Sequence, residues 1–445
     1  MNLAKYLFGA VAALAVLALF HIDPALAQEA EAAAEPAAPT LSAGDTAWML
    51  TSTALVLMMT IPGLALFYGG MVRKKNVLTI LMQCFATTCI VTVLWMLIGY
   101  SLAFTDGGGL QAYIGGASRF LLKDMGVGSL KGTIPESVFM CFQMTFAIIT
   151  PALIVGAFVE RMRFTAVVLF SALWLFFVYV PVAHWVWGGG WLATRGVMDF
   201  AGGLVVHLTA GVSAVLLAIV LGPRVGFPHD VRPPHAPWIT MMGACMLWVG
   251  WFGFNAGSAL SAGADAGMAM TVTHISAATA TLVWIVIESV KFGKPSMVGA
   301  VTGAIAGLAS ITPASGYVGP GAALLIGLAG GSICYLMVMV VKHRFKIDDS
   351  LDVLAVHGVG GALGIMLTAV FADATLGGIG LAEGRSMGGQ AMIQFTGLIA
   401  VLIWSVVVSF VIIKIVQAVV GLRVSAEIEE QGLDVNIHGE RGYNM

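Results

Sequence analysis

Two histidines, His207 and His357, stand in matching contexts within long apolar stretches of the sequence. The first belongs to Val-His-Leu-Thr-Ala-Gly and the second to Val-His-Gly-Val-Gly-Gly, so both read Val-His-x-x-x-Gly. An ionisable side chain at membrane depth is costly and marks a functional site by default. Two neutral imidazoles can share one proton, with one ring donating and the other accepting, and still offer outer nitrogens to a small hydrogen-bonding solute. Such a pair would make a narrow apolar path passable for one polar molecule.

A metal site is the alternative chemistry for paired histidines. Zinc or copper would need a third ligand, and no Cys, Asp or Glu lies within one helical turn of His207 or His357. Each histidine could also be a core residue that is hydrogen-bonded to a backbone carbonyl. The matched positions favour a shared role, and neither a metal nor another cofactor is predicted.

Two aspartates precede the histidines in the sequence. Asp199 is followed by Phe-Ala-Gly-Gly, where its carboxylate could cap the helix that carries His207 and accept hydrogen bonds from the first free amides. A buried carboxylate near an outer vestibule would also favour an arriving cation. Asp352, five residues before His357, is expected to be the corresponding feature on the inner side.

Aromatic residues recur at helical spacing near these groups. Most aromatic stripes are core or interface residues. A rim of Trp and Phe with one serine oxygen can, however, hold a small cation by cation–π attraction and a hydrogen bond. Stacked Phe rings beneath such a rim would exclude ions and chains of water. The candidates are Phe142 and Phe146, Trp187 before a Gly-Gly-Gly turn, and Trp251, Phe254 and Ser258.

Membrane-spanning helices must position these residues. Of 445 residues, 59% are hydrophobic and 10% are charged, whereas soluble domains contain about 25% charged residues. This composition excludes a soluble enzyme and a single-span receptor. Runs of ~20 apolar residues predict an all-α polytopic membrane protein with eleven transmembrane helices, at residues 46–69, 77–104, 135–158, 164–184, 202–222, 238–258, 267–290, 296–314, 319–341, 352–373 and 393–420.

Eleven predicted spans fit two inverted five-helix repeats plus a final helix, an arrangement found in transporters. His207 lies in the fifth span and His357 in the tenth, so each repeat would end with a mid-membrane histidine. Because inverted repeats face opposite ways, the two histidines would approach the bilayer centre from opposite sides and could meet there. Such folds place their sites at this position.

The distribution of basic residues predicts the orientation, because lysine and arginine concentrate in cytoplasmic loops. After Lys5, most basic residues lie in or beside loops that follow odd-numbered spans, or in the tail. The mature N-terminus is therefore predicted outside and the C-terminus inside. The formal net charge is −2 and no basic block is longer than Arg73-Lys74-Lys75, so no nucleic-acid partner is expected. The basic residues after even-numbered spans are Arg119, Lys123, Lys131, Arg195 and Arg385.

The two ends of the chain differ in composition from the predicted spans. Residues 1–27 contain one lysine, an apolar run at 6–20 and small residues near the end, which predicts a cleaved signal peptide. A retained first helix is the alternative. Residues 28–44 are rich in Ala, Pro and Glu and predict a disordered periplasmic lead-in. The membrane domain is predicted at 45–421 and a cytoplasmic regulatory tail at 422–445.

Five segments in order resemble the ammonium transporters of the Amt/Mep/Rh family, most closely bacterial AmtB-type members. The resemblance extends from about Trp48 to the last residues. It implies an eleven-helix protomer in a homotrimer, with one pore per protomer. The segments are TIPGLALFYGG at 60–70, AHWVWGGG at 183–190, DFAGGLVVH at 199–207, GWFGFNAGS at 250–258 and DVLAVH at 352–357.

The resemblance also implies roles for individual residues. Phe142, Trp187 and Ser258 correspond to an external ammonium-recruitment site, and Phe146 and Phe254 to a stacked phenyl gate. His207 and His357 correspond to the histidine pair that lines the pore, with Trp251 beside them. Asp199, and with it Asp352, is expected to act structurally or in deprotonation. The tail resembles the cytoplasmic segment that couples to PII-type signal proteins. These assignments are to Phe142, Phe146, Trp187, Asp199, His207, Trp251, Phe254, Ser258, Asp352 and His357.

A bare cation at the bilayer centre costs about 3 kcal/mol even on lenient scales. The expected mechanism therefore splits ammonium outside and conducts ammonia. The resemblance implies that uptake is electrogenic, and a bacterial inner membrane is the expected location. An ammonium sensor and an Rh-like neutral gas channel are the alternatives. Retention of Trp187 and Ser258 argues against the gas channel. No appended signalling domain is expected after the tail that ends at Met445, and this expectation favours a regulated transporter over a sensor. No nucleophile or cofactor loop accompanies the histidines, so an enzyme is not expected.

Overall fold

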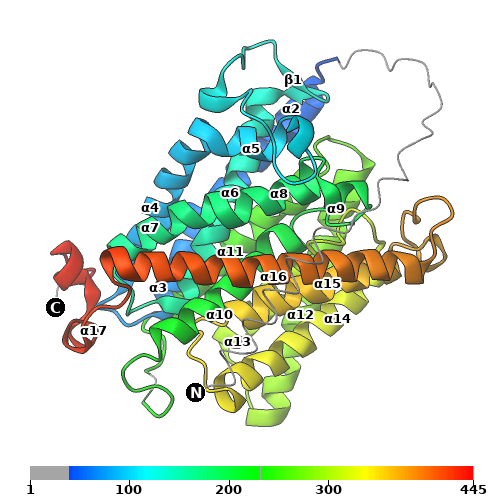
Figure 1. Ribbon diagram of the computed structural model, residues 1–445. Helices are drawn as coiled ribbons and strands as arrows, with labels where there is room; N and C mark the ends of the chain where they lie inside the picture. The colour runs from blue at the N-terminus through cyan, green and yellow to red at the C-terminus, as the bar shows by residue number, and fades with distance from the viewer. Residues whose placement is uncertain (1–39, 231, 444–445) are drawn as a thin grey trace, which may run out of the picture. The chain divides into compact units, whose positions relative to one another are not determined.

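The computed structural model describes residues 40–230 and 232–443 (Figure 1). The predicted signal peptide at 1–27 and most of the predicted lead-in at 28–44 lie outside the described residues. The compact unit Leu41–Met445 is helical, and its described residues contain a single two-stranded hairpin.

The first half of this unit begins at a helix capped by Ser42, whose hydroxyl accepts a hydrogen bond from the Asp45 amide (3.2 Å). Segments named η are wide π turns or short 3-10 turns, and several of them continue an α-helix. The elements are α2 (Ala43–Met58), η1 (Met59–Leu64), α3 (Ala65–Met71), α4 (Val77–Leu94), η2 (Trp95–Gly99), α5 (Tyr100–Phe104), η3 (Gly108–Leu110), η4 (Phe120–Leu122), β1 (Leu130–Lys131), β2 (Ile134–Pro135), α6 (Glu136–Phe158), α7 (Phe164–Trp174), η5 (Leu175–Tyr179), α8 (Val180–Trp187), α9 (Trp191–Thr194), η6 (Gly203–Leu208) and α10 (Thr209–Leu221).

The second half is also a succession of helices and ends in a short tail. Its elements are α11 (Pro237–Trp251), η7 (Phe252–Ala256), α12 (Ala264–Phe292), α13 (Met297–Ile311), α14 (Pro320–Met339), η8 (Val340–Arg344), η9 (Leu354–Gly358), α15 (Val359–Phe371), η10 (Ala374–Leu376), α16 (Met387–Val420), α17 (Ala426–Gln431) and η11 (Asp434–His438).

Ten helices among the described residues are long and apolar enough to cross a membrane. The predicted span at 296–314 corresponds to α13, which has only 15 residues. At ~1.5 Å per residue such a helix is shorter than the ~30 Å hydrocarbon core. The all-helical membrane architecture is thus confirmed, and ten of the eleven predicted spans have the required length.

Wide π turns interrupt several spans, and such turns are frequent at functional sites. In η1 the turn contains Pro62, which has no N–H to complete a regular helical bond. The π turns η6 and η9 contain His207 and His357 and continue into α10 and α15. Each histidine therefore lies on a widened first turn of its helix.

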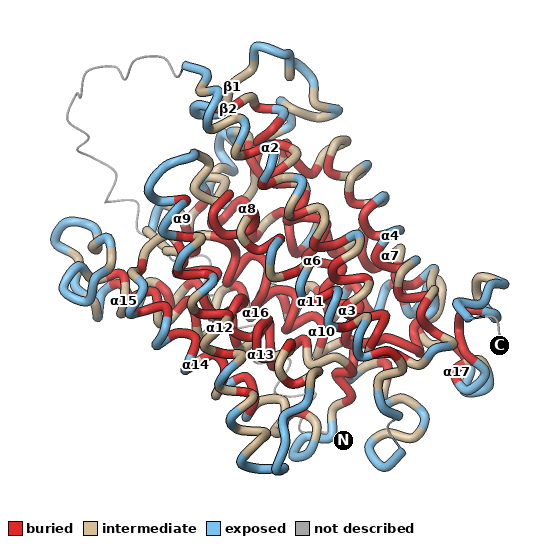
Figure 2. The backbone as a smooth tube through the Cα atoms, turned by 180° about the vertical axis from the view of Figure 1, so that it is seen from behind, coloured by how far each residue is buried: buried red, intermediate tan, exposed pale blue. Residues whose placement is uncertain are grey.

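The core lies around α6 and α10, which contact each other. The apolar window of α6 is 83% buried and that of η6 with α10 is 78% buried; both helices lie within the red interior of Figure 2. Gly211 of α10 approaches Gly358 of η9 so closely that a Cβ at Gly211 would overlap the Gly358 backbone. Small residues at this crossing let the two histidine-bearing segments touch.

The helices end on two opposite sets of loops, which we call the hairpin face, after the β1–β2 hairpin, and the tail face, after the C-terminal tail. On the hairpin face, the Ser42 amide at the start of α2 donates to the Thr133 carbonyl (2.8 Å) in the β1–β2 hairpin. On the tail face, the Asp434 carboxylate accepts from the Thr79 amide (2.8 Å) and so binds the tail to the start of α4. The long helix α16 contacts α7, α10 and α15, and Figure 1 shows it as a single rod lying across the other helices.

Candidate functional site

His207 and His357 are in contact. Their Nδ1 atoms lie 3.2 Å apart, so one ring donates a hydrogen bond and the other accepts it. The rings are stacked, with centroids 5.2 Å apart and an interplanar angle of 24°. Both side chains are buried, and Nε2 of His207 has no hydrogen-bond partner among the described residues. This is the arrangement in which a shared proton leaves outer nitrogens free for a solute.

Asp199 caps the helix that carries His207. Its two carboxylate oxygens accept hydrogen bonds from four consecutive amides, those of Gly202 (2.9 Å), Gly203 (2.6 Å), Leu204 (2.7 Å) and Val205 (3.3 Å). These are the amides that a helix start leaves without internal partners. The carboxylate thus fixes the first turn of the π-helical segment η6.

The residue that corresponds to Asp199 in the second half of the chain is Asp349 rather than Asp352. Asp349 is eight residues before His357, as Asp199 is eight residues before His207. Its Oδ2 accepts from the Leu354 amide at the start of η9 (2.7 Å), whereas Asp352 lies at φ 63° and pairs with Lys342 (2.8 Å). The expectation for Asp352 as the counterpart is therefore corrected. The equal spacing of eight residues was the signal that could have identified Asp349.

An aromatic column leads to the histidine pair. The rings of Phe146 and Phe254 lie 4.2 Å apart at 30°, and Phe254 lies 6.1 Å from the His207 ring at 27°. Trp187 meets Phe146 edge-on at 5.7 Å. Phe142 is fully buried and packs on Phe146 at 5.0 Å. The two rings predicted to form a gate are thus in contact with a 30° tilt, and Phe142 packs against one of them, Phe146.

A cavity on the hairpin face, called the outer cavity after the orientation predicted from the sequence, has a volume of ≈ 800 Å³ and is lined by Phe146, Trp187 and Ser258, but not by Phe142. The Trp187 Nε1–H donates to the carbonyl of Asp199 (2.8 Å), which joins the rim to the helix cap. Ser258 Oγ donates to a carbonyl of its own helix (2.8 Å), so its lone pairs remain available to accept.

Gln143 also lines the outer cavity and was missed by the sequence reasoning. Its side-chain oxygen is buried and has no hydrogen-bond partner among the described residues. A buried acceptor without a partner is costly unless a solute or solvent satisfies it. The available signal was a polar residue between two phenylalanines in an otherwise apolar helix.

A second, enclosed cavity of ≈ 10 Å³ lies at the histidine pair. Its walls include His207, His357, Trp251 and Phe254, with Leu, Ile and Met side chains elsewhere. Trp251 stacks on the His207 ring at 5.6 Å and 21°, and its Nε1–H donates to Thr312 Oγ1 (2.8 Å). The volume is close to the ~10–15 Å³ needed by one water-sized molecule.

A model of the Ammonium Transporter Family matches residues 47–443. The chain belongs to this family of ammonium transporters. It is 47% identical to an ammonium transporter of Bacillus subtilis over 404 residues, which cover 90% of this chain and 98% of that one. It is 44% identical to ammonium transporter Amt1 of Archaeoglobus fulgidus over 405 residues, which cover 91% and 100% of the two chains. The resemblance seen in the sequence is confirmed.

Solved structures of two other proteins share this fold. Mep2 of Saccharomyces cerevisiae superimposes with a TM-score of 0.80 at 35% identity, covering 87% of this chain and 90% of that one. A protein described as a sensor Amt protein superimposes with a TM-score of 0.83 at 29% identity, covering 89% and 98%. The protein is therefore a multi-pass membrane protein of a transporter family.

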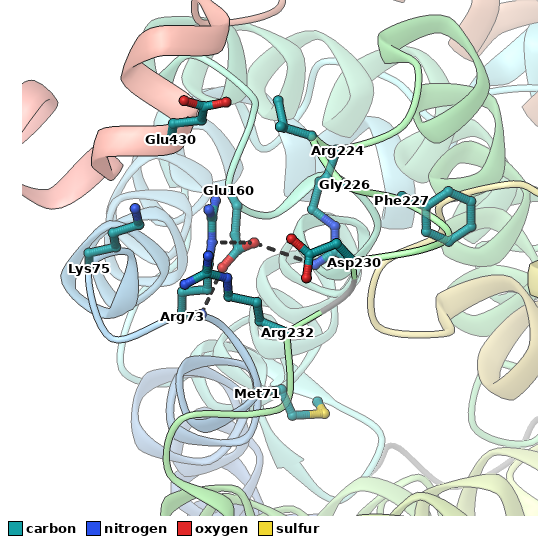
Figure 3. Close-up of a pocket in the computed structure, with 11 residues that line it drawn as sticks. Met71, Arg73, Lys75, Glu160, Arg224, Gly226, Phe227, Asp230, Arg232 and Glu430 are labelled. Carbon is teal, nitrogen blue, oxygen red and sulfur yellow. Dashed lines mark hydrogen bonds and ion pairs between the residues drawn. The ribbon is translucent and has the colours of Figure 1, made fainter.

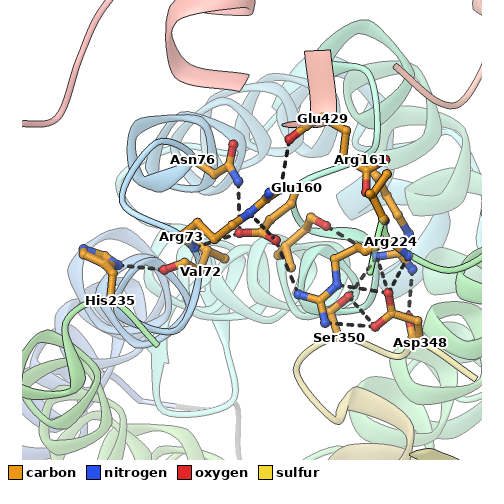
Figure 4. A network of polar contacts seen from close by, with 12 residues as sticks. Val72, Arg73, Asn76, Glu160, Arg161, Arg224, His235, Asp348, Ser350 and Glu429 are labelled. Carbon is orange, nitrogen blue, oxygen red and sulfur yellow. Dashed lines mark hydrogen bonds and ion pairs between the residues drawn. The ribbon is translucent and has the colours of Figure 1, made fainter. Parts of the chain in front are cut away.

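In this ammonium transporter relative, a buried ionic network holds the tail face together (Figure 4). Glu160 pairs with Arg73 (3.1 Å) and Arg224 (3.5 Å). Asp348 pairs with Arg224 (2.9 Å), and the fully buried Arg161 donates to the Asp348 carbonyl (2.7 Å). Burial alone would raise the pKa of both carboxyl groups, but the neighbouring arginines outweigh it and hold each pKa below its usual value.

The tail is bound to the same network. Glu429 of α17 is fully buried; it accepts from the Val225 amide (2.7 Å) and pairs with Arg423 (2.7 Å). Beside it opens a cavity of ≈ 400 Å³ lined by the turn after α3, the loop after α10 and α17. Figure 3 shows Lys75, Arg232 and Glu430 among the charged side chains around it, and their elements lie far apart in the sequence.

Asp349 should make stability depend on pH. Burial, and then the Asp352 carboxylate, raise the pKa of Asp349 to about 6, from 3.8. The folded state therefore holds this proton more tightly than the unfolded state. Protonated Asp349 therefore adds about 3 kcal/mol to the free energy of unfolding below pH ~4. This contribution is lost as the pH rises through ~6.

We expect Asp349→Asn, which keeps an oxygen for the Leu354 amide, to gain up to about 3 kcal/mol relative to the original protein between pH ~4 and ~7. Unfolding free energies in detergent across that range would measure the difference. The partly exposed Asp373, which caps η10, provides Asp373→Asn as the control. A difference between Asp349→Asn and the original protein that stays constant with pH would contradict this assignment.

Proposed function

We propose that the protein recruits ammonium in the outer cavity, removes its proton, and conducts ammonia past the two histidines. One observation carries this proposal: the aromatic column leads from the outer cavity to the His207–His357 pair, where a cavity of ≈ 10 Å³ remains. A neutral molecule the size of water fits that space, whereas a hydrated cation does not. The names of the relatives support ammonium as the substrate.

Trp187 and Ser258 are proposed to bind ammonium. The Trp187 ring can attract a cation through its face, and Ser258 Oγ can accept one N–H bond because its own proton is given to a carbonyl. Phe146 and Phe254 would then act as the gate, with Phe142 holding Phe146 in place. Gln143 adds an amide oxygen on the same cavity.

The proton is proposed to leave ammonium near Asp199 and to follow along the histidines, which makes uptake electrogenic. The Asp199 carboxylate is buried below the rim and linked to Trp187 through its backbone carbonyl. Its negative charge would stabilise the cation before deprotonation. The carboxylate already accepts hydrogen bonds from four backbone amides. We therefore favour a structural and electrostatic role for Asp199 over a role as the final proton acceptor.

The finer architecture is also proposed. The short helix α13 would complete eleven spans, arranged as two inverted five-helix repeats with α16 as the final helix. The Asp-to-His spacing of eight residues in both halves supports the repeat. The hairpin face would lie outside and the tail face in the cytoplasm of a bacterium, and the protomers would form a homotrimer. Asp352 would belong to the inner mouth through its pairing with Lys342.

Regulation by a PII-type protein is proposed for the tail face. The tail segments α17 and η11 are packed against loops of the membrane domain through Glu429 and Asp434. A partner that binds there would contact the tail and those loops together. The charged cavity of Figure 3 offers groups of both signs for such a contact.

Ammonium pulses applied to proteoliposomes on a solid-supported membrane test the proposal. A current specific to ammonium, absent with sodium or potassium, is the expected result. The second candidate is a sensor, favoured by the close fit to the sensor Amt protein. Absence of both a current and a change in an internal pH dye would favour the sensor, whereas a pH change without current would indicate neutral ammonia passage.

Removing the cation-holding groups should weaken ammonium binding. We expect Trp187→Leu combined with Ser258→Ala to raise the half-saturating ammonium concentration at least about tenfold, because a cation–π contact and a hydrogen bond to a charged group are lost. Trp191→Leu is the matched control, because Trp191 lies outside the outer cavity lining and faces Arg195. Equal concentrations for the double variant and the control would contradict the assignment.

A further inference from the structure

We propose that Lys131 is a tethered cation that competes with ammonium for the outer cavity and so lowers the apparent affinity of the protein. This inference rests on the proposed function, since it concerns the same cavity. The side chain of lysine ends in an alkyl-ammonium group, which is a covalently attached analogue of the proposed substrate. No part of the ammonium pathway described above uses it.

Lys131 lines the outer cavity together with Trp187, Ser258 and Phe139. Its Nζ lies 5.7 Å from the centroid of the Phe139 ring, which is within the distance of a cation–π contact. Phe139 itself is 4% exposed. The cavity thus already holds one ammonium group on an aromatic face, close to the rim where a second one would bind.

The position of Lys131 is fixed by the hairpin that carries it. Lys131 pairs with Ile134 in the β1–β2 ladder. At the turn, the Thr133 carbonyl accepts from the Ser42 amide (2.8 Å) and its hydroxyl donates to Asp45 Oδ2 (2.6 Å). The hairpin is therefore bound to the start of α2. Lys131 is held at the edge of the outer cavity by its own pairing with Ile134 and by the contacts of Thr133 with α2 and its cap.

The charge of Lys131 is not neutralised by a direct ion pair among the described residues. The nearby carboxylate of Glu136 is occupied by Arg119, at 2.9 and 3.0 Å, and by the Tyr100 hydroxyl at 3.0 Å. Asp45 is occupied by Thr133 and by the Ala262 amide (2.8 Å). The positive field of Lys131 therefore reaches into the cavity.

Two unit charges about 10 Å apart repel each other enough to change an affinity about two- to tenfold, depending on the dielectric between them. Dissolved salt weakens the repulsion, because the screening length is about 10 Å at 0.1 M ionic strength. The competition should therefore be strongest at low salt. It should depend on the charge of residue 131 and not on the length of its side chain.

The test measures half-saturating ammonium concentrations from currents at low and high ionic strength, the latter set with a salt that is not transported. Lys131→Met keeps the stem and removes the charge, and should lower the value about two- to tenfold at low salt, with a smaller effect at high salt. Lys131→Arg keeps the charge and should match the original protein. Lys123→Met is the control, since Lys123 is an exposed lysine of the same loop outside the cavity lining.

Equal values for Lys131→Met and the original protein would overturn the inference, as would equal decreases for Lys131→Met and Lys131→Arg. If the original protein gave no ammonium current, the proposed transport would be contradicted while the inference would still be decided. Calorimetric titration of the purified variants with ammonium chloride, against sodium chloride, would then compare the affinities directly. Tighter binding by Lys131→Met supports the competition, and unchanged binding excludes it.

Discussion

Replacing both His207 and His357 with leucine is expected to abolish ammonium-evoked currents. The Nδ1 atoms of the two rings lie 3.2 Å apart, and both side chains line the ≈ 10 Å³ cavity. Leucine has a similar volume but no donor or acceptor, so a polar molecule would lose its only imidazole partners there. Leaving a hydrogen-bonding molecule unpaired in an apolar passage costs several kcal/mol. A barrier raised by about 4 kcal/mol slows passage roughly a thousandfold.

The double leucine variant should remain folded, because replacing both partners of a buried polar pair by apolar groups is nearly neutral. Single replacements are worse for stability, since they leave one buried imidazole without its partner. His229→Leu in the exposed loop after α10 is the control for losing a histidine as such. Solid-supported-membrane currents and a thermal midpoint in detergent would be measured together. Unchanged currents in the double variant would refute the role of the pair.

Removing the Asp199 carboxylate is expected to have the second large effect, on stability as well as transport. Asp199→Ala leaves four buried amides without their acceptor. An unsatisfied buried donor costs about 1–3 kcal/mol, so we expect a loss of at least about 3 kcal/mol and no measurable current. The first turn of η6 would no longer be fixed, and with it the position of His207.

Asp199→Asn separates the structural role from the electrostatic one. Its amide oxygen still accepts hydrogen bonds but carries no charge, so we expect it to restore much of the stability and little of the transport. Asp373→Ala is the matched control, because Asp373 caps the exposed η10 turn and should cost about 1 kcal/mol or less. Unfolding midpoints would measure the structural role, and ammonium currents would measure the electrostatic role. Full transport by Asp199→Asn would show that the negative charge is dispensable.

The sequence was sufficient for the class of the protein and for the family. Long apolar runs can be recognised locally, because each span must satisfy the bilayer by its own composition. The repeated Val-His-x-x-x-Gly pattern also predicted that His207 and His357 would meet, and the structure places their rings in contact. The roles of these residues in transport stay predictions that the experiments above would decide.

Local patterns were less informative about distances between helices and about the exact reach of each element. The predicted span at 296–314 is longer than the observed helix α13, which has 15 residues, because composition does not show where a helix ends. Phe142, expected at the cation site, is fully buried, packs against Phe146 and does not line the outer cavity. Which side of a helix faces a cavity depends on neighbouring helices, and spacing of four residues along one helix cannot determine that.

The sequence by itself determined the apolar spans, the paired histidines and the family motifs, since these depend on the type and order of residues. Only the tertiary structure decided which acid caps η9, because Asp349 and Asp352 are three residues apart and the backbone turn at Asp352 directs its carboxylate to Lys342. It alone also placed Lys131 over Phe139. Such contacts join segments through packing and electrostatics in three dimensions, and no local pattern in the chain encodes them.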